Sequence, residues 1–191
     1  MHTIMRTLVA VVAMAVSGPA HAATVVTLDS EELSGATDER VGPVYSAEGV
    51  TLTALPPPQA PNAMPDFFIV GPRSTSFTGS TSLYHHISTG EIVLTRTDGE
   101  AFQLLSIDLA ELPSFDASGP IDFGQFNVMF TGVRKNGQTV TATATVRPFP
   151  AVTTVTLRGF ANLVAVHWFQ GAGGGPGLST HQFDNVVVRL P

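Results

Sequence analysis

A strict two-residue alternation over residues 139–146 constrains the fold of this chain more than any other feature. Valine and alanine occupy the even positions and threonine the odd ones, which predicts a strand with one apolar and one hydroxyl face. A second strand is expected at residues 123–131, and Asn136-Gly137 lies between the two. Because Asn-Gly favours tight turns between strands, we expect a hairpin with a two-residue turn and positive φ at both Asn136 and Gly137.

Similar short segments recur along the rest of the chain. Runs rich in Thr, Val, Leu, Ile and Phe end at Gly, Pro, Asn or Asp, and no segment shows a sustained helical period. Residues 30–37 are expected to form one helical turn at most. The other expected strands are residues 25–28, 50–55, 67–70, 92–95, 102–109, 153–157, 163–169 and 183–190. This pattern predicts an all-β fold, a two-sheet antiparallel β-sandwich of the jelly-roll, galactose-binding-like type.

Residues 1–22 have the composition of a secretory signal peptide. Arg6 supplies the positive charge, residues 8–16 (LVAVVAMAV) form an apolar run, and Ala20-His21-Ala22 offers a small-x-small cleavage site. The apolar run is too short to cross a bilayer as a helix, which needs about 20 residues. The sequence therefore predicts export, to the periplasm or the medium, of a single domain at residues 23–191.

Charge and the absence of cysteine narrow the possible partners. Loss of Arg6 with the leader leaves eight basic against fifteen acidic residues, a net charge of −7 with histidine neutral. A chain this acidic repels phosphate backbones, so nucleic acid is not an expected partner, and no later apolar run is long enough to span a membrane. Without cysteine, stability has to come from packing, with a bound ion as one further source.

No catalytic motif stands out. There is no Gly-x-Ser-x-Gly, and nothing among the fifteen acidic residues marks a glycosidase pair. His85 and His86 are adjacent, so on a strand they point to opposite faces and are poorly placed to bind one metal ion. These observations favour a non-catalytic binding or structural domain. A polysaccharide hydrolase or lyase is the alternative, and it would need several carboxylates, or histidines such as His167 and His181, in one cleft.

Trp168 and Tyr84 are the candidate ligand-binding residues, because aromatic faces suit the apolar faces of pyranose rings. Trp168 also has a competing interpretation as a core residue. Val164 and Val166 share its parity in the strand expected at residues 163–169, and these apolar neighbours favour the core interpretation.

Acidic residues near both ends of the domain predict a structural calcium ion. Asp29 and Glu31 follow the first expected strand, and Asp184 lies at the start of the last one. The first and last strands of a sandwich commonly lie near each other, so these carboxylates could meet at one edge and hold Ca²⁺, which prefers oxygen ligands. In the alternative interpretation, Asp184 caps a turn and the other acids are solvated.

Segments of the C-terminal half resemble a family of exported bacterial proteins. They are Asp98-Gly99-Glu100-Ala101-Phe102 leading into residues 105–110, Phe130-Thr131-Gly132 followed by Asn136-Gly137, and residues 163–171 (LVAVHWFQG) before Phe183-Asp184-Asn185-Val186. Their order resembles the jelly-roll ectodomains of PEP-CTERM proteins, which exosortase sorts to the cell envelope. The resemblance covers roughly residues 80–190.

The resemblance implies binding to glycan or extracellular matrix. Such ectodomains are also similar to carbohydrate-binding modules, in which an aspartate of the closing strand, here Asp184, often helps to hold a structural calcium ion. This chain ends at Pro191 without the Pro-Glu-Pro motif, apolar helix and basic tail of the family. We therefore expect a freely secreted or periplasmic form rather than an anchored one.

Overall fold

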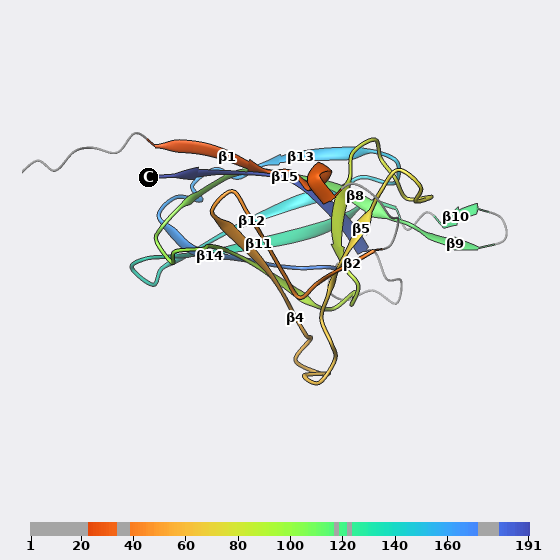
Figure 1. The fold of residues 1–191 in the computed structure, drawn as a ribbon, viewed down its shortest axis with the longest axis horizontal. Coiled ribbons are helices and arrows are strands. Elements are labelled where there is room, and N and C mark those ends of the chain that lie inside the picture. The colour runs from red at the N-terminus through yellow and green to blue at the C-terminus, as the bar shows by residue number, and fades with distance from the viewer. Residues whose placement is uncertain (1–22, 34–38, 117–118, 122–123, 172–179) are drawn as a thin grey trace, which may run out of the picture.

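A computed structural model of the chain describes residues 23–33, 39–116, 119–121, 124–171 and 180–191. Within these residues, the strands form two antiparallel sheets packed face to face, and the one helical element is the four-residue 3₁₀ helix η1 (Ser30–Leu33) (Figure 1). The expected leader, residues 1–22, lies outside the described residues. A search of the described part of the chain finds no helix with the length and hydropathy of a membrane span.

The larger sheet has seven strands. Its order is β13-β8-β15-β6-β5-β2, and β1 pairs with the second half of β15. The bounds are β1 (Thr24–Leu28), β2 (Arg40–Gly42), β5 (Phe67–Val70), β6 (Ser82–His85), β8 (Gln103–Leu112), β13 (Val152–Thr156) and β15 (Thr180–Leu190). The pairing of β1 with β15 confirms that the first and last strands lie side by side.

The other sheet has six strands in the order β12-β11-β14-β7-β4-β3. The bounds are β3 (Val44–Ala47), β4 (Val50–Leu55), β7 (Glu91–Arg96), β11 (Phe126–Arg134), β12 (Thr139–Val146) and β14 (Leu163–Phe169). A short ribbon of β9 (Ser114–Asp116) and β10 (Gly119–Ile121) extends from the sandwich (Figure 1). The two-sheet antiparallel sandwich of the jelly-roll type is thus confirmed.

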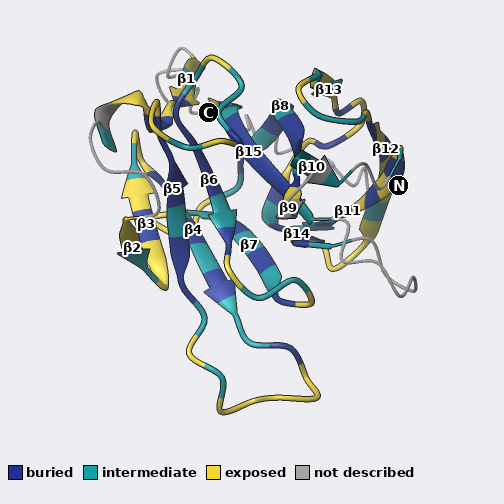
Figure 2. Cartoon of the chain, turned by 90° about the vertical axis from the view of Figure 1, so that its right-hand side faces the viewer, coloured by how far each residue is buried: buried dark blue, intermediate teal, exposed yellow. Residues whose placement is uncertain are grey.

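The core lies between the sheets and is built from the inward positions of the alternating strands. Burial alternates residue by residue along β4 and along most of β11 (Figure 2). At the centre, the Trp168 ring lies 5.5 Å from the Phe130 ring and 5.6 Å from the Phe183 ring, measured between centroids. Phe130 and Trp168 come from the six-stranded sheet and Phe183 from the other, so this cluster joins the two layers without any disulfide.

The β11–β12 hairpin is confirmed, but its predicted turn is wrong. Only Gly137 has positive φ in this turn, at 82°, and Asn136 does not. Gly137 N–H donates to Arg134 O at 2.8 Å, and Arg134 N–H donates to Gln138 O at 2.8 Å. The loop therefore has three residues and is closed by a glycine in the left-handed region. This geometry, like the two-residue turn predicted from Asn-Gly, fits the twist of the two strands.

Five strands were not expected from the sequence: β2, β3, β6, β9 and β10. All are three or four residues long. In β6 (Ser-Leu-Tyr-His), three of the four residues are buried, so the strand lacks the alternation that marks a half-buried strand. Short segments of this kind are strands because of their hydrogen-bonding partners, which sequence periodicity does not reveal.

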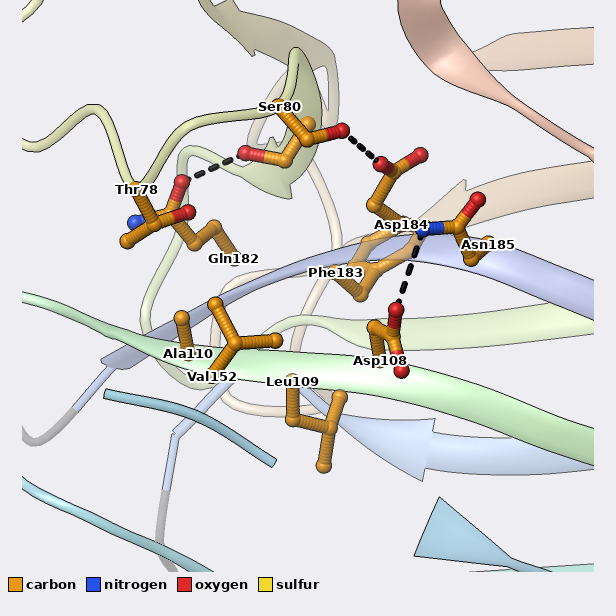
Figure 3. Close-up of a pocket in the computed structure, with 11 residues that line it drawn as sticks. Thr78, Ser80, Asp108, Leu109, Ala110, Val152, Gln182, Phe183, Asp184 and Asn185 are labelled. Atoms are coloured by element: carbon orange, nitrogen blue, oxygen red, sulfur yellow. Dashed lines mark hydrogen bonds between the residues drawn. The ribbon is translucent and has the colours of Figure 1, made fainter. Parts of the chain in front are cut away.

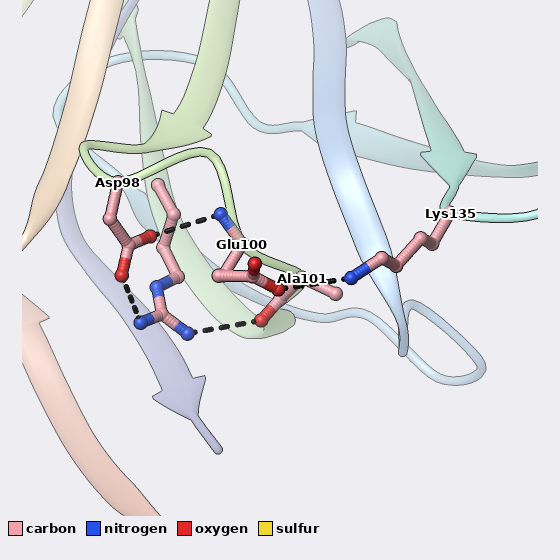
Figure 4. Close-up of polar contacts among 5 residues, drawn as sticks. Asp98, Glu100, Ala101 and Lys135 are labelled. Atoms are coloured by element: carbon pink, nitrogen blue, oxygen red, sulfur yellow. Dashed lines mark hydrogen bonds and ion pairs between the residues drawn. The ribbon is translucent and has the colours of Figure 1, made fainter.

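Side-chain contacts close the end of the sandwich where β7 leads into β8 (Figure 4). The Arg96 guanidinium donates to the Ala101 carbonyl at 3.3 Å and pairs with Asp98, whose pKa is lowered chiefly by a hydrogen bond from Glu100 N–H. Lys135, from the β11–β12 loop, pairs with Glu100 at 3.0 Å. The acidic residues of this segment therefore have structural partners.

Candidate functional site

A β-bulge in β15 shapes the surface of the seven-stranded sheet. Asp184 pairs with Asp108 and Val187 pairs with Ser106, so two residues of β15 stand opposite one residue of β8. Asn185, in the bulge, has φ of 47°, a left-handed conformation that Asn tolerates better than most residues. Because the bulge interrupts the alternation, Asp184 and Asn185 both present their side chains to the outer face.

These two residues line a small pocket on the outer face of this sheet (Figure 3). The pocket is shallow, with a cavity volume of about 30 Å³, and it opens to solvent. Its walls come from β6, β8, β13, β15 and the 71–81 loop that joins β5 to β6. The lining residues are Thr78, Ser80, Ser82, Asp108, Leu109, Ala110, Val152, Gln182, Phe183, Asp184 and Asn185.

Asp184 is the most buried carboxylate of the pocket, with 6% of its surface exposed. One carboxylate oxygen accepts a 3.1 Å hydrogen bond from Ser30 N–H, and the other accepts a bond from the Ser80 hydroxyl. Burial raises the pKa of Asp184, and these hydrogen bonds oppose the increase. Asp184 thus links η1, the 71–81 loop and β15.

Asp108 lies directly opposite Asp184 on the neighbouring strand. One of its oxygens accepts a 3.0 Å hydrogen bond from the Asn185 amide (Figure 3). Among the described residues, no Lys, Arg or His side chain forms an ion pair with either aspartate. The pocket therefore combines two carboxylates, which accept hydrogen bonds, with amide and hydroxyl groups and a few apolar contacts.

Gln182 fastens the 71–81 loop over the sheet. Its amide nitrogen donates to Ser76 O at 2.8 Å and to Glu111 O at 3.2 Å, and its oxygen accepts from the Ser82 hydroxyl. All three of these donors and acceptors lie in a buried environment. Satisfied buried amides of this kind hold a loop rigidly, so Thr78 and Ser80 are kept at the rim of the pocket.

The prediction of Trp168 as a surface platform for sugar is wrong. The side chain is 1% exposed and packs between Phe130 and Phe183 in the core. Its indole N–H is buried without a hydrogen-bond partner in the described structure, which is consistent with a packing role. The apolar neighbours of the same parity, Val166 above all, had favoured this core interpretation.

Tyr84 lies on the outer face of the same sheet as the pocket. It is half-buried, and its ring centroid is 5.8 Å from that of Phe68 on β5. The Phe68 ring is in turn 5.4 Å from the ring of His86. Next to this group, Arg40 Nε pairs with Asp66 at 2.9 Å. Three neighbouring rings and one charged pair therefore occupy the surface of β2, β5 and β6.

The three residues predicted to bind calcium lie near one another but make separate contacts. An Asp29 oxygen accepts a 2.9 Å hydrogen bond from Glu31 N–H, and the Glu31 carboxylate accepts a 2.9 Å bond from Thr81 N–H. Asp184 contacts Ser30 and Ser80 instead. Within the described ranges, no group of three or more His, Cys, Asp or Glu is arranged to hold a metal ion. The calcium site stays a prediction.

The histidines have different environments. His85 is buried, with Nε2 3.0 Å from Leu55 O and Nδ1 3.0 Å from Ile87 N, and burial lowers its pKa. His86 is exposed on the other side of the strand end. His181 is fully buried, and neither ring nitrogen has a hydrogen-bond partner in the described structure. His167, on the other sheet, contacts Glu91. The structure therefore does not bring these histidines together in one open cleft.

Sequence reasoning did not identify Asp108 or Gln182 as pocket residues. Asp108 and Asn185, which bond to each other, are 77 residues apart in the chain, and no local pattern pairs them. A signal was present at Asp184-Asn185, two polar residues in succession that break the two-residue spacing between the apolar residues Phe183 and Val186. Such a break indicates a bulge, and bulges are frequent next to binding sites.

Comparisons with known proteins identify no family. No protein-family model matches this chain, and no curated protein matches its sequence. Among solved structures, it is similar to a carbohydrate-binding module of family 29, with 11% identity over 88% of this chain and 90% of that one, at a TM-score of 0.38. A mutant of the module CBM29-2 is also similar, with 12% identity over 88% and 85% of the chains, at a TM-score of 0.38. Similarity of this degree does not identify a ligand. The resemblance to PEP-CTERM ectodomains stays a prediction.

Proposed function

We propose that this protein is an exported, non-catalytic glycan-binding domain whose site is the pocket on the seven-stranded sheet. The observation that carries the proposal is the convergence of Asp108, Asp184 and Asn185 with the hydroxyls of Thr78 and Ser80. Sugar hydroxyls both donate and accept hydrogen bonds, so they match a mixture of carboxylate, amide and hydroxyl groups. The negative charge of the pocket disfavours phosphate-bearing ligands.

The aromatic group beside the pocket supports a ligand longer than one sugar. The pairings of β15 with β6 and of β6 with β5 place Tyr84 next to Gln182 and Phe68 next to Tyr84. Two interstrand spacings, about 10 Å, therefore separate the pocket strand from Phe68. The apolar face of a sugar ring packs well on an aromatic ring. One oligosaccharide could then occupy the pocket and contact Tyr84.

Binding to a panel of neutral, acidic and amino-sugar polysaccharides tests this function. We expect the mature protein to be retained on at least one of them. Asp108→Asn and Asn185→Gly should each weaken binding about tenfold or more, equivalent to about 1.4 kcal/mol. The first replaces an accepting carboxylate oxygen with a donating amide nitrogen, and the second removes the amide from the pocket. Glycine is chosen at position 185 because it keeps the positive φ without strain.

Matched controls separate the pocket from general effects on the protein. Glu100→Gln lies at the far, Lys135-paired turn and should leave binding unchanged. Tyr84→Ala should weaken retention of long oligosaccharides more than that of monosaccharides. A folded protein that is retained on none of the polysaccharides would contradict the proposal.

A glycan hydrolase or lyase is the second candidate, and the two aspartates favour it. Side chains directly opposite on neighbouring strands have Cβ atoms about 5 Å apart, and cleavage of a glycosidic bond requires two carboxyl groups near each other. Burial raises the pKa of Asp184, as a general acid requires. Release of reducing ends by the wild type, and its loss in Asp184→Asn, would establish this activity. Retention of the polysaccharide without cleavage supports the binding function instead.

A structural calcium ion remains part of the proposal. The pairing of β1 with β15 supports it, because Asp29 is then near enough to Asp184 for its charge to contribute to the raised pKa of that group. Calcium should raise the melting temperature of chelator-treated protein, by an amount equivalent to about 2.7 kcal/mol at a hundredfold excess over Kd. Asp184→Ala should abolish the increase and Glu100→Ala should leave it intact. Identical melting curves with calcium and with chelator would exclude the site.

A further inference from the structure

The outer face of the six-stranded sheet exposes large apolar side chains that the glycan site does not use. Met129 on β11 is 56% exposed, Phe169 on β14 is 45% exposed and Val44 on β3 is 51% exposed. These are half of the six large hydrophobic side chains found exposed in the described part of the chain. Exposed apolar side chains that share one face of a protein often mark a surface that contacts another molecule.

The strand register brings two of these residues together, whereas Val44 lies on β3 at the opposite edge of the sheet. Thr131 pairs with His167, so Met129, two residues earlier on β11, stands opposite Phe169 on β14. Thr143 of the edge strand β12 pairs with Met129 on the other side. Most other outward positions of this sheet are threonine, serine, valine or alanine, so the face has few long side chains to project above it.

Charge is nearly absent from this face. The acidic residue found among the outward positions of the six described strands is Glu91, whose carboxylate lies 3.0 Å from His167 Nδ1. The mature protein as a whole carries a net charge of −7 with histidine neutral. Two copies would repel one another through most of their surface, but much less through this face. The charge distribution therefore points to a second copy of the same chain as the occupant.

The size of the face is sufficient for a weak dimer. Six strands span about 24 Å across the sheet, and about six residues per strand span about 20 Å along it, which gives about 500 Å² per copy. Two copies would bury about 1,000 Å², near the lower limit for specific interfaces. Threonine hydroxyls both donate and accept hydrogen bonds. The threonine-rich face of one copy can therefore bond to the same face of a second copy related to it by a two-fold axis.

We propose that two copies of this protein associate through the outer faces of their six-stranded sheets, with Met129 and Phe169 in the contact. The seven-stranded sheets then lie on opposite sides of the dimer. If the proposed function is correct, each dimer presents two glycan sites facing away from each other, which would allow it to cross-link a matrix. The dimer itself does not rest on that function.

Sedimentation equilibrium of the mature protein over a wide concentration range tests the dimer. The weight-average mass should rise from that of one copy toward that of two. Met129→Asp and Phe169→Asp each place two like charges at the two-fold contact, so the dimer should weaken about tenfold or more. Met129→Asp changes an exposed side chain, and its melting temperature at low concentration should be unchanged. Phe169→Asp places its carboxylate opposite Glu91 of β7, so its melting temperature should fall slightly. Met64→Asp, which alters an exposed methionine of the 55–66 loop, is the matched control and should dimerise like the wild type.

Three outcomes would overturn the proposal. The wild type could remain a monomer at the highest concentration, or the dimer could persist unchanged in both aspartate variants. The third is a monomeric wild type whose retention on a polysaccharide is lost in Phe169→Asp, which would assign the face to glycan instead. Loss of glycan binding in the pocket variants with the dimer intact would concern the proposed function alone.

Discussion

Replacing Trp168 with alanine should lower the free energy of unfolding by about 3–5 kcal/mol, a large part of the 5–15 kcal/mol typical of a domain. The indole is almost fully buried and contacts Phe130 of its own sheet and Phe183 of the facing sheet. Its removal would leave a cavity between the two layers that a β-sandwich cannot easily collapse. Urea denaturation followed by circular dichroism measures the change.

Trp168→Phe is the matched variant and should lose much less stability. It keeps an aromatic ring in the cluster and removes the indole N–H, which has no hydrogen-bond partner in the described structure. Glycan retention by Trp168→Phe should equal that of the wild type. A folded Trp168→Ala protein with unchanged stability and abolished binding would restore the tryptophan as a ligand platform.

Acidification should destabilise the domain, and His181 should account for much of the effect. Burial lowers the pKa of His181 to about 3, against an ordinary value of 6.5. Between these two values the unfolded chain binds more protons than the folded one, so stability is present above pH 6.5 and is lost as pH falls. At pH 5 the loss from this residue is about 2 kcal/mol, since each pH unit below 6.5 costs about 1.36 kcal/mol.

Other groups modify this pH dependence. His85 is also buried and its pKa is also lowered, so it acts in the same direction. Asp184 acts in the opposite direction because its pKa is raised in the folded state. As the pH falls, the folded state binds a proton at Asp184 before the unfolded state does, which restores some stability in acid. Two further residues adjoin His181. Glu111 is its cross-strand partner on β8, and the Gln170 amide donates a hydrogen bond to the His181 carbonyl.

His181→Leu isolates the contribution of this histidine. The imidazole makes no side-chain hydrogen bond within the described structure, so stability at pH 7.5 should fall little or not at all. Between pH 7.5 and pH 5, urea denaturation should show about 2 kcal/mol less destabilisation than in the wild type. His86→Ala, which changes an exposed histidine, is the control. Equal losses in wild type and His181→Leu would show that His181 does not determine the acid response.

Side-chain alternation predicted most long strands, because it records which residues face the core whatever their partner is. Thr139–Val146 and Val50–Leu55 have the expected bounds. The same reasoning failed for β6, where Ser82 and His85 are buried through contacts with Gln182 and with the Leu55 carbonyl. It also failed for the turn at Asn136, where two loop geometries fit one dipeptide. Sequence parity also favoured the core for Trp168, although aromatic chemistry suggested a ligand platform.

The sequence by itself determined an all-β sandwich held together by packing, because alternation, turn residues and the lack of cysteine are local properties of the chain. Only the tertiary structure decided where a ligand could bind. The pocket exists because β8 and β15 pair, because a bulge turns Asn185 toward Asp108, and because Gln182 holds the 71–81 loop above them. Each of these contacts joins residues distant in the chain, and the free energy that selects them comes from the packing of the complete fold.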